Sequence, residues 1–211
     1  MIKNILNYFS QKKKGRFLDV GAFDGVKCSN TYHLWKSGWF GVYVEPSVTN
    51  FIALKNNINC RCDLYNIALS SKSEIVKFHD CKNGDVWGVS TIKQAHADSW
   101  THGHFSQYFK PAQYEQYFTK TATWNQLLNS CGNNFDFISI DVEGANCELL
   151  RSLPFKRLKK VNLICIEKDN DDVCEEYTKI FENNGFRLHS QNTGNLMFAA
   201  KNNIANSVKL L

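Results

Sequence analysis

The sequence predicts an α/β fold: a mostly parallel, doubly wound sheet with helices on both faces. Along most of the chain, short apolar runs alternate with amphipathic stretches whose apolar residues recur at helical spacing. Several apolar runs end at an acidic residue, where a parallel strand would reach the carboxyl edge of its sheet. Strands that alternate with helices favour parallel pairing. The 211 residues contain no internal repeat or low-complexity linker, so a single domain over residues 1–211 is expected.

The alternation runs without a break up to residue 78. Residues 1–15 carry apolar side chains at helical spacing and predict an N-terminal helix. Ser29 is expected to cap the helix that follows the first strand. The predicted strands are residues 16–20, 41–44, 64–69 and 75–78, and the predicted helices are residues 29–36 and a segment ending at residue 57.

The alternation returns after residue 120. Thr123 is expected to cap a helix that runs to about residue 130. A short helix should end before Pro154, and Gly185 should end a helix over residues 171–184. The predicted strands are residues 135–140, 161–166, 187–189 and 196–200, of which the last two form an antiparallel hairpin.

Residues 80–120 lie between these two parts and show few periodic signals. A long irregular segment in a compact domain often covers or binds a substrate, so we expect an insert or lid near an acceptor site. A small satellite core is the alternative role for its aromatic side chains. They are Trp87, Trp100, Phe105, Tyr108, Phe109, Tyr114, Tyr117 and Phe118.

Four carboxylates are expected along the carboxyl edge of the sheet, because Asp19, Glu45, Asp141 and Glu167 each end a predicted strand. Acidic residues also cap helices often, so each could be incidental. The first of them begins a turn with two glycines, in the stretch "FLDVGAFDG" at residues 17–25, and bare backbone there would let a ligand approach closely. Glu45 follows the second glycine at the offset where acidic residues bind ribose hydroxyls in nucleotide-binding folds.

The charge of this turn discriminates between ligands. Asp19 and Asp24 flank it and would repel the pyrophosphate of a dinucleotide, which favours helix N-termini without nearby carboxylates. The same carboxylates would suit the ammonium and sulfonium groups of S-adenosylmethionine, whose ribose diol could bind Glu45. The turn therefore favours S-adenosylmethionine over NAD or ATP.

Several segments together resemble the FkbM-type S-adenosylmethionine-dependent methyltransferases. They are "FLDVGAFDG", "SNTYHLWKSGWFGVYVEP", "NIALS", "TATWNQLL" and "DFISIDVEGANCELL", in this order between about residues 17 and 200. The resemblance implies a Rossmann-like class I methyltransferase fold with a seven-stranded sheet, and O-methylation of a sugar, glycan or similar natural-product hydroxyl. It is also compatible with a domain of a larger glycan-modifying protein. Asn146 and Trp35 depart from the family pattern, each at a position where glutamate is common, which leaves the acceptor side open.

The resemblance also implies which residues hold the cofactor. Asp19 and the two glycines would bind its amino acid end, Glu45 its ribose, and residues 66–69 would lie near the adenine. The full expected set is Asp19, Gly21, Ala22, Phe23, Asp24, Gly25, Ser29, Asn30, Glu45, Pro46, Ala68 and Asp141.

Methyl transfer to a hydroxyl needs an aligned acceptor and a base within hydrogen-bond reach of its proton. We expect Asp141 and Glu143 to be catalytic, with His102 of the insert as a rival base. The expected acceptor contacts are Ser90, Thr91, His96, Glu167 and Lys168. No metal site is assigned. A divalent ion such as Mg²⁺ on Asp141, Glu167 and Asp169 is the alternative, since hard cations prefer oxygen ligands.

Composition limits the remaining classes. The chain has no apolar run long enough to span a bilayer and no secretory leader pattern, and its eight cysteines form no CxxC pair. A cytoplasmic protein with reduced thiols is expected. The net charge of +5 and Lys12–Lys14 leave an RNA 2′-O-methyltransferase open, but only five arginines and no evident basic stripe make nucleic acid a weak candidate. A non-catalytic binding module on the same fold is the other alternative.

Overall fold

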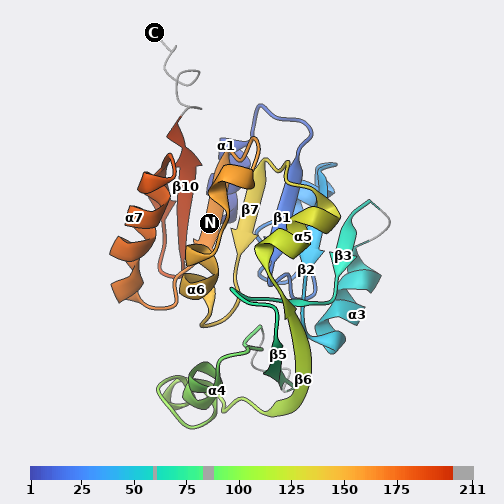
Figure 1. Ribbon diagram of the computed structural model, residues 1–211, viewed down its shortest axis with the longest axis vertical. Coiled ribbons are helices and arrows are strands. Elements are labelled where there is room, and N and C mark those ends of the chain that lie inside the picture. The colour runs from blue at the N-terminus through green and yellow to red at the C-terminus, as the bar shows by residue number, and fades with distance from the viewer. Residues whose placement is uncertain (59–60, 83–87, 202–211) are drawn as a thin grey trace.

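A seven-stranded sheet with the order β3-β2-β1-β7-β8-β10-β9 forms the centre of the molecule (Figure 1). The structure is a computed structural model that describes residues 1–58, 61–82 and 88–201. Neighbouring strands are parallel from β3 to β8, whereas β10 pairs antiparallel with both β8 and β9. The strands are β1 (Arg16–Val20), β2 (Phe40–Val44), β3 (Asp63–Tyr65), β7 (Phe137–Ile140), β8 (Leu163–Glu167), β9 (Phe186–Gln191) and β10 (Asn195–Ala200). The predicted fold class and the C-terminal hairpin are confirmed.

Helices cover both faces of the sheet, and the alternation of side chains along each strand divides the core between them. In β1, Leu18 packs in the cluster beneath α5, α6 and α7, whereas Phe17 packs in the cluster beneath α1, α2 and α3. Both side chains are fully buried. The helices are α1 (Ile2–Tyr8), α2 (Tyr32–Lys36), α3 (Val48–Asn57), α5 (Trp124–Cys131), α6 (Asn146–Arg151) and α7 (Cys174–Asn183).

Local capping explains where α5 begins, whereas α2 begins without a side-chain cap on its N-cap residue. Thr123 caps α5, as predicted, and the structure shows that it does so in a reciprocal capping box with Gln126. The helix expected from Ser29 begins later, at Tyr32, although the Ser29 hydroxyl still accepts a hydrogen bond from the Tyr32 amide at 3.0 Å. Short 3₁₀ turns, η2 (Phe155–Arg157) and η3 (Asp171–Val173), follow α6 and precede α7.

The segment that was expected to be irregular contains much of a second, three-stranded sheet with the order β4-β6-β5. Its strands are β4 (Ala68–Leu69), β5 (Ile75–Cys81) and β6 (Tyr114–Ala122), and between β5 and β6 lie α4 (Gln94–Thr101) and η1 (Phe105–Gln107). The strand predicted over residues 64–69 was wrong as one element. The chain bends at Asn66, whose side-chain amide donates hydrogen bonds to the backbone carbonyls of Glu45 and Pro46. The two halves of the predicted strand therefore pair in different sheets, β3 with β2 and β4 with β6.

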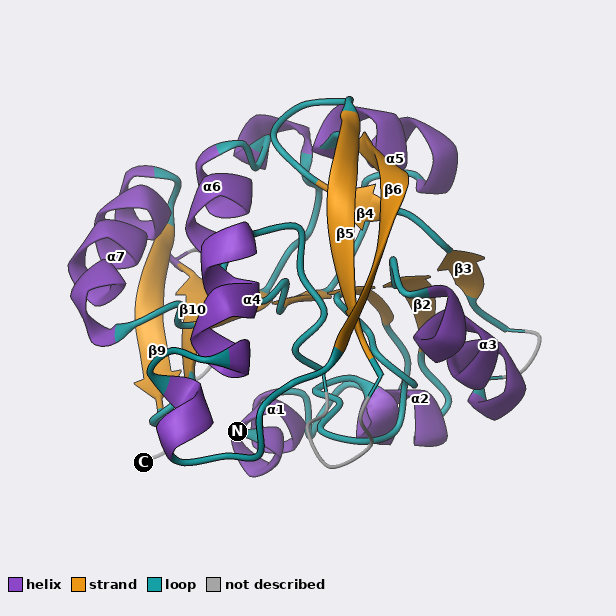
Figure 2. Ribbon diagram, turned by 90° about the horizontal axis from the view of Figure 1, so that it is seen from below, coloured by secondary structure: helices purple, strands orange, loops and turns teal. Residues whose placement is uncertain are grey.

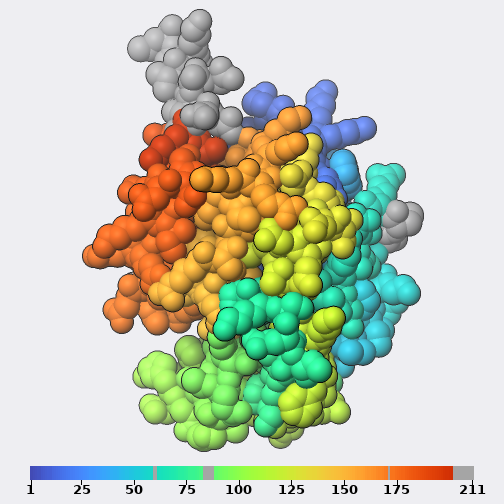
Figure 3. Space-filling model, viewed as in Figure 1, coloured from blue at the N-terminus to red at the C-terminus, as the bar shows by residue number. Residues whose placement is uncertain are grey.

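The small sheet and α4 lie across the carboxyl edge of the large sheet, as Figure 2 shows from below. In the space-filling view, the green segment that contains α4 and η1 extends beyond the body of the molecule at this edge (Figure 3). The insert therefore lies where the four strand-terminal carboxylates were expected. Within the described residues, no helix is long and apolar enough to cross a membrane.

Candidate active site

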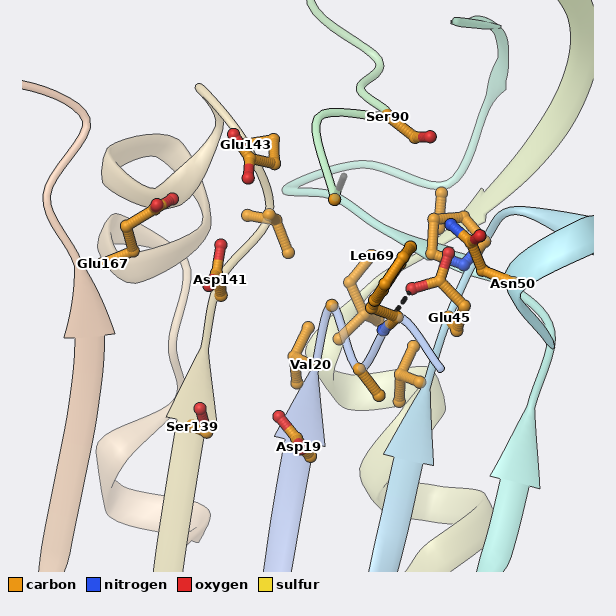
Figure 4. Close-up of a pocket in the computed structure, with 18 of the residues that line it drawn as sticks. Asp19, Val20, Glu45, Asn50, Leu69, Ser90, Ser139, Asp141, Glu143 and Glu167 are labelled. Carbon is orange, nitrogen blue, oxygen red and sulfur yellow. Dashed lines mark hydrogen bonds between the residues drawn. The ribbon is translucent and has the colours of Figure 1, made fainter. Parts of the chain in front are cut away.

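A cavity of about 330 Å³ opens at the carboxyl edge of the large sheet, between the ends of β1, β2, β7 and β8 and the insert (Figure 4). β1 pairs with β2 on one side and β7 on the other, so chain order reverses here. In open α/β sheets, this reversal is where loops diverge and leave room for a ligand. Carboxylates lie on both sides of the cavity, with Asp19 and Glu45 on one side and Asp141, Glu143 and Glu167 on the other.

Glu45 follows β2 and is held by two backbone amides. Its Oε2 accepts a hydrogen bond from the Phe23 amide and its Oε1 one from the Ser47 amide, both at 2.8 Å. Burial raises the pKa of Glu45 to about 8, because it penalises the charged form more than these amides stabilise it. Each oxygen keeps acceptor capacity, and the carboxylate lines the cavity, so it can bind further hydroxyl donors.

Asp19 lies near the end of β1, on the same side of the cavity as Glu45, and is only 3% exposed. The Thr31 hydroxyl donates to its Oδ2 at 2.5 Å, and Thr31 is itself held by Ser29. Burial raises the pKa of Asp19 to about 6, against the opposing effect of hydrogen bonds from Thr31 and Ser139. A buried carboxylate with this environment favours a cationic ligand, which would compensate its charge.

Close chain packing requires both glycines of the turn, and Gly21 also lines the cavity. A Cβ on Gly21 would lie 1.6 Å from the Asp141 backbone carbonyl, and a Cβ on Gly25 would lie 2.6 Å from the Leu54 side chain. Both residues also have positive φ angles, of 83° and 75°. Their small size therefore serves chain packing, and Gly25 is not among the described residues that line the cavity.

Apolar side chains line the cavity between the carboxylate groups and the small sheet. Pro46 follows Glu45, Ala68 and Leu69 come from β4, and Phe78 comes from β5. A flat aromatic ring could pack against these surfaces without losing a polar partner.

Asp141, Glu143 and Glu167 form the second carboxylate group, with one oxygen of each within 4.8 Å of the others. Burial, and after it repulsion from Glu143, raise the pKa of Asp141 to about 7. Burial and the charge of Asp141 also raise the pKa of Glu167. Like charges this close favour a proton shared within the group at neutral pH. The backbone of Glu143 has a positive φ of 47°, and its carbonyl accepts a hydrogen bond from the Thr91 hydroxyl at 2.7 Å.

The insert contributes hydroxyls and one histidine to this side. Ser90 and Thr91 line the cavity, and the Ser90 hydroxyl donates to the fully buried Asp80 at 3.1 Å. His96 of α4 places its Nε2 3.0 Å from Oε2 of Glu143. The Trp100 indole N–H is also placed to donate a hydrogen bond to the same Nε2, at 3.1 Å. An indole N–H only donates and a carboxylate only accepts, so Nε2 can satisfy one of these contacts at a time.

The profile of the FkbM methyltransferase domain matches residues 19–188, which is most of the chain. The chain belongs to the FkbM methyltransferase family. The matched region of this FkbM methyltransferase spans all the strand ends that surround the cavity and the whole insert. The predicted family is confirmed, and so is the coarse prediction of a methyltransferase.

Solved structures with the same fold are also methyltransferases. A ribosomal protein L11 methylase from Lactobacillus delbrueckii subsp. bulgaricus has a TM-score of 0.52 at 11% identity, over 95% of this chain and 77% of that one. A precorrin-6y C5,15-methyltransferase from Geobacter metallireducens has a TM-score of 0.51 at 9% identity, over 94% of this chain and 86% of that one. The METTL16 methyltransferase domain has a TM-score of 0.53 at 10% identity, over 95% of this chain and 66% of that one. At these identities the similarity establishes the fold alone. No curated protein matches the chain.

Most of the residues expected at the cofactor line the cavity of this FkbM methyltransferase. Asp24 does not line its described part; instead, its Oδ1 accepts hydrogen bonds from the Val26 and Lys27 amides and shapes the turn. The expected residues that do line it are Asp19, Gly21, Ala22, Phe23, Ser29, Asn30, Glu45, Pro46, Ala68 and Asp141.

The expected acceptor-side residues divide in the same way. Glu143, Ser90, Thr91 and Glu167 line the cavity, whereas His96 reaches it through Glu143. Lys168 and His102 are not among the described lining residues, and His102 is exposed where α4 ends. Trp87 lies outside the described residues.

The alternative metal triad does not assemble as expected. Asp169 instead accepts hydrogen bonds from the Asn146 side chain at 2.8 Å and from the Cys147 amide at 3.0 Å, at the start of α6. The buried Asn146 also donates to Glu167 at 3.3 Å. Asn146 therefore bridges two carboxylates with donors, where a glutamate would add a further negative charge.

Among the described lining residues, the polar or charged ones that the sequence did not indicate are Lys27, Asn50, Ser139 and Asn195. Ser139 is the register partner of Asp19 on β7, and Asn195 is the partner of Glu167 on β10. Strand pairing brings them to the cavity, and pairing between distant strands leaves no local signal. Asn50 lies on α3 after the Glu45-Pro46 pair, which is the one signal that could have indicated it.

Proposed function

We propose that this FkbM methyltransferase is an S-adenosylmethionine-dependent O-methyltransferase that acts on a hydroxyl of a sugar or glycan. The observation that carries the proposal is the division of one cavity between two carboxylate groups. Asp19 and Glu45 are held by hydrogen bonds from their own loops, as expected for a cofactor wall. Asp141, Glu143 and Glu167 crowd together at the other side, as expected for a group that binds and deprotonates an acceptor.

The donors and surfaces of the first wall fit the cofactor. Asp19 would bind its ammonium group, with Asn30 close to the same end through its hydrogen bond to Ser139. Glu45 would accept hydrogen bonds from the ribose diol, and the apolar surfaces of Pro46, Leu69 and Phe78 would cover the adenine. When bound, S-adenosylmethionine supplies an already activated methyl group, so the protein's main tasks are alignment and proton removal.

On the acceptor side, Glu143 would take the proton of the attacking hydroxyl, while Asp141 accepts a hydrogen bond that orients it. Glu167 would stay protonated and stabilise the neighbouring carboxylate, which follows from the raised pKa values of Glu167 and Asp141. Ser90, Thr91 and Asn195 add neutral hydrogen-bonding groups to the cavity. Neutral donors and acceptors of this kind suit the several hydroxyls of a sugar ring.

The carboxylates that line the cavity oppose a nucleic-acid acceptor. Five carboxylates line the cavity, and Lys27 is the one lysine or arginine among the described lining residues. A phosphate backbone placed near this mouth would be repelled, whereas nucleic-acid sites are dominated by basic side chains.

Mass spectrometry after incubation with methyl-labelled cofactor and a panel of deoxysugar and amino-sugar glycosides tests the proposal. Transfer of one label to a sugar oxygen is the expected result, and calorimetric titration should show cofactor binding by the protein alone. Labelled RNA with unlabelled glycosides would overturn the acceptor assignment. Absence of cofactor binding would instead favour a non-catalytic module. An EDTA arm reports whether a divalent ion takes part, with loss of turnover on metal removal pointing to the carboxylate group as its site.

A further inference from the structure

One side chain of the insert contacts the second carboxylate group directly. His96 and Glu143 are largely buried, with 16% and 17% of their side chains exposed, and Nε2 of His96 lies 3.0 Å from Oε2 of Glu143. The imidazole also packs on the loop that carries Glu143, because a Cβ on Gly144 would lie 2.8 Å from His96 Nδ1. The histidine is therefore seated on the loop after β7.

The insert holds Glu143 at a second point. The Thr91 hydroxyl donates to the Glu143 backbone carbonyl at 2.7 Å. Lys93, at the start of α4, forms an ion pair with Glu148 of α6, which follows the same loop. Backbone, side chain and the adjoining helix are thus all tied to the insert, and the positive φ of Glu143 shows that its backbone is held in an uncommon conformation.

We propose that His96 is a positioning residue that holds the Glu143 carboxylate toward the acceptor, so that the insert sets the geometry of the proposed base. This inference rests on the proposed role of Glu143. The core fixes where the loop that carries Glu143 leaves the sheet, at the end of β7. The direction of the Glu143 carboxylate depends instead on a donor from α4. A base that is misdirected by about 1 Å can lose about 100-fold in rate, so such a contact has functional weight.

The competing contact with Trp100 gives the proposal a spectroscopic signature. The Glu143 contact requires a proton on Nε2 of His96, whereas the indole N–H can bind Nε2 only when that proton is absent. The inference assigns the Nε2–H tautomer. Trp100 keeps its place without this hydrogen bond, because its ring stacks on Phe105 with centroids 4.6 Å apart.

A double-mutant cycle with the acceptor identified by the glycoside panel tests the role of His96. His96→Ala should lower kcat by about 10- to 100-fold, with acceptor KM and cofactor Kd within about twofold of the parent. His96→Gln should restore most of kcat, because its amide N–H can donate to Glu143. In a Glu143→Ala background, His96→Ala should change kcat by less than about twofold, since no carboxylate remains to be held.

Gln94→Ala is the matched control, because Gln94 is exposed on the same helix and binds only Asp98 among its described side-chain partners. It should leave kcat unchanged. An equal loss from His96→Ala in both backgrounds would overturn the proposal, and so would a His96→Gln variant as slow as His96→Ala. Either result would mean that His96 acts through the folding of the insert.

Nitrogen-15 NMR of labelled histidine separates this proposal from the proposed function, because it needs no acceptor. The His96 signal should report the Nε2–H tautomer in the parent and lose that preference in Glu143→Ala. If no glycoside is methylated, the proposed function fails while the NMR result still decides whether His96 holds Glu143. An identical tautomer in both proteins would overturn the inference.

Discussion

The two sides of the cavity hold their carboxylates in different ways. Glu45 receives two backbone amides from neighbouring loops, and Asp19 receives a threonine hydroxyl from the segment that leads into α2. Asp141 and Glu167 instead face each other and Glu143, and their pKa values are raised partly by that mutual repulsion. One side is satisfied by the chain that builds it, and the other is left with excess negative charge.

This difference indicates which side is complete in the free protein. The first side is made by the βα loops of β1 and β2, which are close in sequence and bind each other. The second depends on contacts from the insert, through Thr91 and His96, and on donors from Asn146. We expect changes on the first side to affect mainly cofactor affinity and changes on the second to affect mainly turnover.

The largest effect is expected from disturbing the contact between the two sides of the cavity, which Gly21 makes with the Asp141 backbone carbonyl. Gly21→Ala should prevent folding or lower stability by more than about 3 kcal/mol, because the new Cβ would lie 1.6 Å from the Asp141 carbonyl. Gly38→Ala is the control: Gly38 has a similar φ of 90° but nothing within 4 Å. It should cost only about 1 kcal/mol in denaturant unfolding. Equal costs would show that backbone conformation, rather than the close approach, requires Gly21.

Removing charge from the second side should have the next largest effect. Glu143→Gln and Asp141→Asn should each lower kcat by about 10²- to 10⁴-fold, because a base or its orienting partner is lost. Cofactor Kd from calorimetry should change little. Glu175→Gln, at an exposed position on α7, serves as the control and should keep parent kcat. Weaker cofactor binding with unchanged kcat would reverse the assignment of the two sides.

A smaller effect is expected on the first side. Glu45→Gln should weaken cofactor binding by about 10- to 100-fold, because the amide has one acceptor oxygen in place of the two carboxyl oxygens, and its NH2 group would face a backbone N–H donor. Thermal unfolding of the free variant should be compared in parallel, since Glu45 also binds the Phe23 and Ser47 amides. Asp63→Asn, at the opposite edge of the sheet, is the control and should bind as tightly as the parent.

The smallest effect concerns the pH dependence of stability. Folding raises the pKa of Asp141 from an ordinary value near 4 to about 7, so the native state binds more protons than the unfolded chain between these values. Its contribution to stability is complete below about pH 4 and is lost as pH rises through 7. Glu167 is the second carboxyl of this group whose pKa is raised on folding, so Glu167→Gln removes its share of the pH dependence and should flatten the decline between pH 5 and 8 by about 1 kcal/mol. A steeper decline in denaturant unfolding would contradict this explanation.

The sequence was sufficient for the parts of the fold that local patterns govern. The apolar runs of β1, β2, β7 and β8 and the Thr123 cap of α5 were predicted close to their observed bounds. The strand β6 was missed because it pairs with β5 as an exposed ribbon, so its sequence lacks the apolar run of a buried strand. The break at Asn66 was missed because it depends on carbonyls of residues 45 and 46.

The same division applies to the site. Carboxylates at strand ends could be predicted, because parallel strands bring their carboxyl ends to one edge of the sheet. That Asp169 caps α6, that His96 rather than His102 reaches Glu143, and that Gly21 accommodates the Asp141 carbonyl could not be predicted. Each is a contact between segments far apart in the chain.

By itself, the amino-acid order determined the family, the alternating strands and helices, and the edge of the sheet on which the acidic residues gather. These features follow from short-range periodicity and from the geometry of parallel pairing. Only the tertiary structure decided which carboxylates are satisfied and which repel one another, because that depends on donors and charges a few ångströms away in space. The contact of α4 with the loop after β7 is the clearest case, since its two partners, His96 and Glu143, lie 47 positions apart along the chain.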